Sequence, residues 1–345
     1  MTSWPSTPAA IAEDVPPAGA GARLAALLDS ARVAYAVHAL AELGIAELLA
    51  DGPADVAALA ESAGCDPGAL RRLLRAGAFA GVFRANEAGS FALTPMGQAL
   101  RREVPGSRLP SVLYQGRIVF PAYRHLAEAV RTGGPVFERA FGLPFYDYLD
   151  RNTTENELTY LEAHDRDRHL VTHCVARVDW SGCHRIADVG GGTGAFLAFV
   201  LARVPQARGV LYDRPEVLPV SKEFLVRQGM GGRVELAGGD FYTDPLPPAD
   251  MYLLKNTVHS LDDADAVRLL GHLRDAMRAT PGARLLICER VVPDGDSRDE
   301  ANLLDIDMLL LHGGRERTVA EWREVLRAAG LRWDTTAEVL LCTAE

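Results

Sequence analysis

A glycine-rich segment near the middle of the chain has the spacing of a nucleotide-binding turn. Residues 186–194 read Ile-Ala-Asp-Val-Gly-Gly-Gly-Thr-Gly, after an apolar run and before an expected helix. Glycines let the backbone turn tightly and approach a ligand beside a helix N-terminus. Asp213, at the end of the next apolar run, could bind ribose hydroxyl groups. The spacing Gly190-x-Gly192-x-x-Ala195 also fits a relaxed dinucleotide pattern, and a merely tight turn is the plainest alternative, so the motif alone does not choose a ligand.

The elements around this motif predict an α/β fold. From Arg185 onward, short apolar runs alternate with stretches of helical spacing, which is typical of a doubly wound sheet. Thr318-x-x-Glu321 is a capping box that opens a helix to Ala329, after which two final strands are expected. The expected strands are residues 186–189, 209–212, 233–236, 251–254, 284–288, 331–335 and 338–342.

The N-terminal half predicts a small, mainly helical domain. Leu and Ala recur at helical spacing over residues 22–50, and a short helix is expected around 54–61. Asp66 and Pro67 supply an N-cap and a first-turn proline for a helix to about Ala80, and a hairpin over 81–94 completes a winged-helix pattern. We expect four parts: a loose tail over 1–20, a winged-helix-like domain over 21–105, a helical linker and pocket region over 106–180 with a loop near 133–144, and a ligand-binding domain over 181–345.

The motifs that follow the glycine segment resemble one enzyme family. Residues 188–194 resemble the motif with which class I methyltransferases bind S-adenosylmethionine (SAM). Leu254-Lys255-x-x-x-His259 resembles the catalytic segment of the plant-type small-molecule O-methyltransferases, which include caffeate-type enzymes and bacterial natural-product tailoring enzymes. Gly239-Asp240-Phe241, Glu289 and residues 313–318 match the same family in order, over about 22–343. The resemblance implies a C-terminal Rossmann-like SAM-binding sheet and an N-terminal winged-helix dimerisation domain, and hence a homodimer.

The resemblance also implies how the cofactor binds. SAM would lie across the carboxyl ends of the first strands and leave as S-adenosylhomocysteine (SAH). Three glycines would border its amino-acid moiety, Asp213 would hold the ribose diol, and Asp240 with Phe241 would contact the adenine. The full set of expected cofactor residues is Asp188, Gly190, Gly192, Gly194, Asp213, Arg214, Asp240, Phe241 and Lys255.

Methyl transfer requires that two reactants be positioned and that the acceptor be deprotonated. The resemblance makes His259 the general base, and an unperturbed pKa of about 6.5 suits a phenolic proton. Glu289 and Glu316 match the two acids that flank this base, and one of them would orient the imidazole. We therefore expect an enzyme that moves a methyl group to a hydroxyl of a small aromatic natural product.

Two positions depart from the family pattern. The family commonly has His-Asp-Trp where this chain has His259-Ser260-Leu261, so an uncharged hydroxyl replaces the acid after the base. The family often has F-x-x-x-M near the methyl group, where this chain has Tyr160-x-x-x-His164. His164, His259 and His312 could then share a pocket and ligate a metal, but we expect no metal. The expected pocket residues are Tyr160, His164, Asp307, Met308 and His312.

The composition restricts the partners. Lys plus Arg minus Asp plus Glu is 36 − 46 = −10, and an acidic protein repels nucleic-acid phosphates. No apolar run is expected to reach the roughly 18 residues of a membrane span, and no signal-peptide pattern opens the chain. We expect a cytoplasmic protein that binds a small molecule. The five scattered cysteines predict free, mostly buried thiols. The Ala- and Arg-rich, Lys-poor composition is consistent with bacterial secondary metabolism such as antibiotic biosynthesis.

Other functions remain open from the sequence alone. Some relatives of these enzymes bind SAM yet catalyse decarboxylation, hydroxylation or ring closure, and the same scaffold serves N- and C-methylation. The glycine motif permits an NAD-dependent oxidoreductase, although the later His/Glu series argues against it. A winged helix also permits a transcription regulator, with Arg71, Arg72 and Arg75 on its recognition helix.

Overall fold

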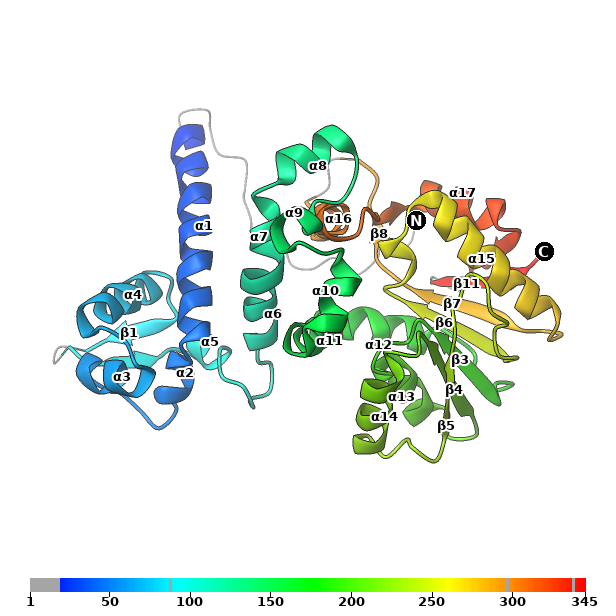
Figure 1. Ribbon diagram of the computed structural model, residues 1–345, viewed down its shortest axis with the longest axis horizontal. Helices are drawn as coiled ribbons and strands as arrows, with labels where there is room; N and C mark the ends of the chain where they lie inside the picture. The colour runs from blue at the N-terminus through cyan, green and yellow to red at the C-terminus, as the bar shows by residue number, and fades with distance from the viewer. Residues whose placement is uncertain (1–18, 87–88, 296–297, 337–338) are drawn as a thin grey trace. The chain divides into compact units, whose positions relative to one another are not determined.

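The computed structural model describes residues 19–86, 89–295, 298–336 and 339–345. The chain divides into two compact units (Figure 1). Unit 1 contains Ala122–Asn152 and Ala163–Glu345, and the described part of unit 2 contains 19–121 and Thr153–Glu162. Most of the expected loose tail, residues 1–18, lies outside the described residues.

Unit 1 is built on a seven-stranded sheet in the order β10-β11-β7-β6-β3-β4-β5, which confirms the expected doubly wound α/β fold. Strands β3 to β7 run parallel, whereas β10 and β11 add antiparallel strands at one edge. The strand order reverses between β3 and β6, and ligands bind at the carboxyl ends of strands at such a switch point. The strands are β3 (Arg185–Val189), β4 (Arg208–Asp213), β5 (Val234–Gly238), β6 (Met251–Lys255), β7 (Arg284–Cys288), β10 (Leu331–Trp333) and β11 (Leu340–Ala344).

Helices cover both faces of this sheet (Figure 1). One face packs against α15 (Asp263–Arg278) and α17 (Val319–Ala328), whose capping box at Thr318 is present as expected. The other face packs against α12 (Arg168–Ala176), α13 (Ala195–Arg203) and α14 (Leu218–Arg227). Strands buried on both faces carry continuous apolar runs, which explains why they were readable in the sequence.

The remaining elements of unit 1 are short. A helix, α9, forms inside residues 133–144, where a loop was expected. Gly142 ends it in the left-handed conformation (φ 77°), and the rings of Phe137 and Phe141 stack with centroids 4.2 Å apart. These elements are α8 (Leu126–Thr132), α9 (Phe137–Phe141), α10 (Phe145–Arg151), η3 (Val258–Ser260), β8 (Val291–Val292), α16 (Ala301–Leu311) and β9 (Arg317–Thr318).

Unit 2 has the expected helices followed by a two-stranded antiparallel hairpin around one apolar core. Asp66 caps the helix that contains the expected first-turn proline, and its side chain accepts a hydrogen bond from the Ala69 amide at 2.7 Å. Helices α7 (Phe120–Tyr123) and α11 (Thr153–Arg166) each pass from one unit to the other. The other elements are α1 (Ala20–Glu42), α2 (Ile45–Leu48), α3 (Val56–Ala63), α4 (Pro67–Phe79), β1 (Phe83–Ala85), β2 (Phe91–Leu93), α5 (Pro95–Gln98), α6 (Leu109–Tyr114) and η2 (Gln115–Val119).

Helix α1 is mostly exposed despite its apolar sequence. Leu24, Leu27, Leu28 and Tyr35 are all at least half exposed. By length and composition alone α1 could cross a membrane, although no membrane span was expected from the sequence. One such helix near an N-terminus is weak evidence of a membrane span. The exposure of apolar side chains on α1 is therefore not explained by a membrane span alone.

Candidate active site

The glycine-rich segment forms the turn between β3 and α13. Gly190, Gly192 and Gly194 have φ angles of 69°, 55° and 82°, a region that other residues rarely adopt. Space is short as well, because a Cβ on Gly194 would lie 2.7 Å from Leu211 Cδ1 and one on Gly190 would lie 3.1 Å from Thr257 Oγ1. The turn therefore requires glycine for its conformation and for its close packing.

Two carboxyl groups lie beside this turn. Asp213 Oδ2 accepts a hydrogen bond from the Gly192 amide, and its Oδ1 accepts one from the Arg214 amide, both at 2.8 Å. Asp188 is buried, and its Oδ2 has no hydrogen-bond partner within the described residues. Burial, with the nearby charge of Asp213, raises the pKa of Asp188 to about 7, and burial also raises the pKa of Asp213. An unsatisfied buried acceptor is costly, so this region fits a ligand with hydrogen-bond donors, such as SAM.

The segment after β5 adds a further wall. A Cβ on Gly239 would lie 2.2 Å from the Tyr212 hydroxyl oxygen, so a larger residue there would have to displace the Tyr212 side chain. The Phe241 ring reaches to 3.8 Å from the Cβ position of Gly190, which places it beside the glycine turn. Asp240 is exposed, and its Oδ1 accepts a hydrogen bond from the Tyr242 amide at 2.8 Å. Asp240 and Phe241 therefore lie on the loop that follows β5, and their contact with adenine stays a prediction.

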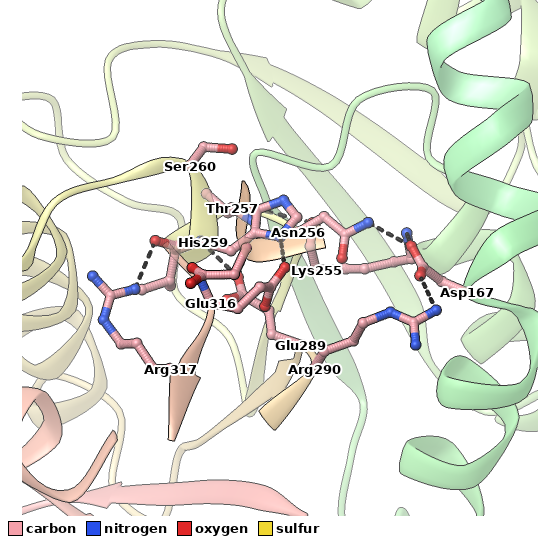
Figure 2. A network of polar contacts seen from close by, with 12 residues as sticks. Asp167, Lys255, Asn256, Thr257, His259, Ser260, Glu289, Arg290, Glu316 and Arg317 are labelled. Atoms are coloured by element: carbon pink, nitrogen blue, oxygen red, sulfur yellow. Dashed lines mark hydrogen bonds and ion pairs between the residues drawn. The ribbon is translucent and has the colours of Figure 1, made fainter. Parts of the chain in front are cut away.

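The candidate base lies on the short helix η3, after β6. His259 is buried, and its Nδ1 lies 2.8 Å from Glu316 Oε1 (Figure 2). Burial alone would lower the pKa of His259, but the charge and hydrogen bond of Glu316, with the charge of Glu289, raise it above its ordinary value. Among the described residues, His259 Nε2 has no hydrogen-bond partner. Nδ1 is therefore held by Glu316, and Nε2 is left to accept a proton from a bound molecule.

Glu289 supports the turn rather than the ring. Its Oε1 accepts hydrogen bonds from the amides of Thr257 at 2.9 Å and Val258 at 2.6 Å. Burial raises the pKa of Glu289. The sequence left open which acid orients the imidazole, and in this geometry Glu316 contacts the ring while Glu289 holds the backbone that presents it.

Arg317 is a second support that the sequence analysis missed. Its fully buried guanidinium donates to the carbonyl oxygens of Val258 at 3.1 Å and Leu261 at 3.0 Å, and it is paired with Asp263. Figure 2 shows Arg317 near His259 and Glu316. The Arg315 amide donates to the His259 carbonyl at 2.8 Å. The segment 313–318 was matched as a motif, but nothing in its spacing indicated that Arg317 clamps the turn carrying the histidine.

Lys255 ends β6 in a buried ionic cluster. Its Nζ lies 3.1 Å from Oδ2 of Asp167, a residue that the sequence analysis did not select. Asn256 and Arg290 contact the same carboxylate (Figure 2). The amine of Lys255, an expected cofactor contact, therefore has a protein partner in this structure.

The expected pocket residues fall into two groups. Asp307 and Met308 are buried on α16, where Asp307 accepts a hydrogen bond from the Tyr123 hydroxyl at 2.7 Å and burial raises its pKa to about 6. His312 follows α16 and packs against aromatic rings of α10, with centroid distances of 4.4 Å to Phe145 and 5.3 Å to Tyr146. Burial, with the charge of His259, lowers the pKa of His312 to about 3, so its imidazole is neutral.

The other two pocket assignments are less closely tied to the site. His164 is exposed near the end of α11, and Tyr160 lies in the part of α11 that belongs to unit 2, so both assignments stay predictions. Within the described ranges, no group of three or more His, Cys, Asp or Glu side chains could hold a metal ion. His164, His259 and His312 therefore do not form such a group.

Ser260 occupies the position where the family commonly has an acid. Its Oγ accepts a hydrogen bond from the Tyr146 hydroxyl at 3.1 Å, which ties α10 to the turn that carries His259. The replacement of the usual acid is therefore accommodated by a neutral contact with an aromatic side chain.

The sheet carries a glycine turn at its switch point and a buried His–Glu pair at the neighbouring strand end. This is the arrangement that the resemblance to Rossmann-like methyltransferases implies. The model of the O-methyltransferase domain matches residues 123–332, and that of the O-methyltransferase dimerisation domain matches residues 25–103. The chain belongs to this O-methyltransferase family and is a SAM-dependent enzyme.

Similar proteins methylate both oxygen and nitrogen. The chain is 41% identical to 8-amino-8-demethylriboflavin N,N-dimethyltransferase of Streptomyces davaonensis, over 87% of this chain and 86% of that one. It is 34% identical to phenazine O-methyltransferase PhzM of Lysobacter antibioticus, over 86% and 87%. The crystal structure of CalO1, a methyltransferase in calicheamicin biosynthesis in its SAH-bound form, matches with a TM-score of 0.76 at 31% identity, over 96% of this chain and 100% of that one.

Proposed function

We propose that this enzyme transfers the methyl group of SAM to a hydroxyl of a small aromatic natural product, with His259 as general base. The observation that carries the proposal is the buried imidazole whose Nδ1 contacts Glu316 while Nε2 has no partner among the described residues. That arrangement is suited to removing one proton from a molecule placed at Nε2.

The proton movement follows from the hydrogen bonds. A neutral His259 that donates Nδ1–H to Glu316 presents an unprotonated Nε2 to the acceptor hydroxyl. When the hydroxyl loses its proton to Nε2, the carboxylate of Glu316 stabilises the resulting imidazolium. SAM supplies the electrophilic methyl group. The supports of Glu289 and Arg317 hold the imidazole in place, which matters because displacement requires close alignment.

We propose that the acceptor lies against the aromatic rings of Phe145, Tyr146 and His312, with Asp307 and Met308 nearby. A neutral imidazole beside two aromatic rings offers flat, weakly polar surface, which suits a planar ring system. His164 remains a proposed member of this pocket, and Tyr160 stays a substrate contact predicted from the sequence alone. The phenazine named for one relative is an aromatic compound of this kind.

N-methylation is a second candidate, because the relative with 41% identity is named as an N,N-dimethyltransferase. A neutral aromatic amine attacks through its lone pair and needs no prior deprotonation, whereas a phenol does. The buried His259–Glu316 pair therefore favours a hydroxyl acceptor. A reaction without methyl transfer would consume no SAM, so equimolar SAH and methylated product would exclude it.

We propose that the cofactor is held by the residues around the glycine turn: Asp188, Gly190, Gly192, Gly194, Asp213, Arg214, Asp240, Phe241 and Lys255. The unpartnered Oδ2 of Asp188 supports the amino-acid end, and the position of Asp213 at the end of β4 supports a ribose contact.

The Asp213 assignment predicts weaker cofactor binding in a variant. Asp213→Ala should weaken SAM binding by about 1–3 kcal/mol, as for a charged hydrogen bond left unmade. Calorimetry measures this, with Asp275→Ala, an exposed acid on α15, as the matched control. Asp213→Asn separates the role of the residue in the glycine turn from its proposed contact with the ribose, because an amide oxygen can still accept a hydrogen bond from the Gly192 amide. Unchanged SAM affinity in Asp213→Ala would refute the ribose contact.

The dimerisation-domain match supports a homodimer, and we propose that α1 forms part of its interface. Leu24 and Leu28 are 62% and 65% exposed on that helix, and exposed apolar surface of this extent marks an interface. We also propose domain limits of 21–105, 106–180 and 181–345, a cytoplasmic location, and no binding to nucleic acid or membranes.

Light scattering at micromolar concentration should show a dimer. Leu24→Glu/Leu28→Glu should shift the mass toward a monomer, because two charges would have to be buried at the interface. Val226→Glu, at an exposed valine on α14, is the matched control and should stay dimeric. A monomeric wild-type protein would overturn the proposal.

A further inference from the structure

Asp167 is the centre of a buried ionic cluster that the mechanism above does not use. It lies between α11 and α12 and is 1% exposed. Its Oδ2 accepts hydrogen bonds from Lys255 Nζ at 3.1 Å and from Asn256 Nδ2 at 2.6 Å, and its Oδ1 lies 3.5 Å from Arg290 Nη2 (Figure 2). Arg166 also contacts this carboxylate, with Nε 3.2 Å from Oδ1.

The partners of Asp167 come from two strand ends that carry the catalytic segment. Lys255 ends β6, four residues before His259, and Arg290 follows Glu289 after β7. Asn256 has a φ of 53°, the one left-handed non-glycine residue in the described ranges, and its amide is held by Asp167. Such a backbone is kept only where neighbouring contacts hold it. Asp167 therefore fixes the start of both loops.

The charges of the cluster reach the cofactor site. Burial alone would raise the pKa of Asp167, but Arg166, Lys255 and Arg290 hold it far below its usual range, so this carboxyl is ionised. The Lys255 charge also acts on Asp188 at the glycine turn, where it opposes the effect of burial on the Asp188 pKa. Strands β3 and β6 are direct neighbours, which brings Lys255 beside that turn.

We propose that Asp167 is a positioning residue that also masks the positive charge of Lys255 and Arg290, so that the enzyme can bind a cofactor with a cationic sulfur. SAM and SAH differ by one methyl group and one positive charge. An unmasked cation beside their site would therefore weaken SAM binding more than SAH binding, whereas a change in packing alone would weaken both alike. The inference rests on the proposed cofactor site at the glycine turn.

Asp167→Asn tests the proposal, because it keeps the shape of the side chain and one acceptor oxygen but removes its charge. Calorimetry on the full-length protein gives Kd for SAM and for SAH. We expect the ratio of Kd for SAM to Kd for SAH to rise on the order of fivefold, as for one added unit charge in a partly screened site. Equal changes in both Kd values would show a merely structural role and overturn the proposal.

Two further variants separate charge from packing. Asp250→Asn makes the same change at the opposite end of β6, where Asp250 accepts from the amides of His184 and Arg185 at 2.8 Å, and it should leave the ratio unchanged. Lys255→Met removes a cation. It should lower the ratio of Kd for SAM to Kd for SAH, whether made alone or together with Asp167→Asn. This variant keeps the test decisive if Asp167→Asn does not fold, since an unchanged ratio in Lys255→Met would contradict the proposal.

A wild-type protein that bound neither ligand would instead contradict the proposed cofactor site. The ratio does not depend on His259 or on the acceptor, so the test stands apart from the assignment of the base.

Discussion

Replacing His259 with Ala is expected to lower kcat by about 10²–10⁴, the usual worth of a positioned proton transfer. The imidazole is the buried group whose Nδ1 is bound to Glu316 and whose Nε2 is left for the acceptor. Initial rates of SAH formation at saturating SAM and acceptor would measure the loss.

Two comparisons separate a lost base from a damaged fold. SAM affinity should hardly change in His259→Ala, because the imidazole faces the acceptor. The loss should also be smaller for an acceptor whose hydroxyl is already ionised, or for an aromatic amine, since neither needs a base before attack. Near-normal turnover of a phenolic acceptor at pH 7 would remove His259 from this role.

Replacing Glu316 with Gln is expected to lower kcat on the order of 10², and by no more than the roughly 10⁴ lost when the acid of a Ser-His-Asp triad becomes an amide. The amide keeps the size of the side chain but cannot stabilise the imidazolium. It can also bind the wrong tautomer of His259, which would place the proton on Nε2.

The pH dependence of the same variant gives a signed test. The base acts deprotonated, so wild-type kcat/KM should rise with pH through the pKa of His259, which Glu316 raises above its ordinary value. Without the charge of Glu316, burial favours the neutral imidazole and lowers its pKa. The rise in kcat/KM should therefore occur at lower pH in Glu316→Gln, and the maximal kcat/KM should be smaller. Glu289→Gln is the matched comparison, and its shift should have the same direction but be smaller. Coincident profiles for wild type and Glu316→Gln would contradict the pairing.

The sequence was sufficient to predict the sheet and the glycine turn at its edge, because both depend on local patterns. Strands buried on two faces give continuous apolar runs, and helices between them give helical spacing, so the doubly wound order could be inferred. The glycine turn was readable because Gly190, Gly192 and Gly194 occupy a conformation that only glycine adopts readily.

The contacts that hold the catalytic turn join residues far apart in the sequence, and hydrophobic periodicity does not predict such contacts. Arg317 reaches the carbonyl of Val258 across 59 positions of sequence, and Asp167 reaches Lys255 across 88. Neither Arg317 nor Asp167 lies in a sequence motif whose spacing indicates its partner. The separate roles of Glu289 and Glu316 could be assigned only from the structure. Both acids match the family motifs, but only Glu316 contacts the imidazole, whereas Glu289 binds backbone amides.

The central claim is tested most directly by following a labelled methyl group from SAM. The acceptors would be pairs of planar aromatic compounds, such as phenazines or flavins, that carry either a hydroxyl or an amino group at the same position. We expect one SAH per methylated product, the label on oxygen in each productive hydroxyl acceptor, and a loss in His259→Ala that is far larger for the hydroxyl member of each pair. Label found only on nitrogen or carbon, SAM consumed without a methylated acceptor, or equal losses for both members of a pair would contradict the account.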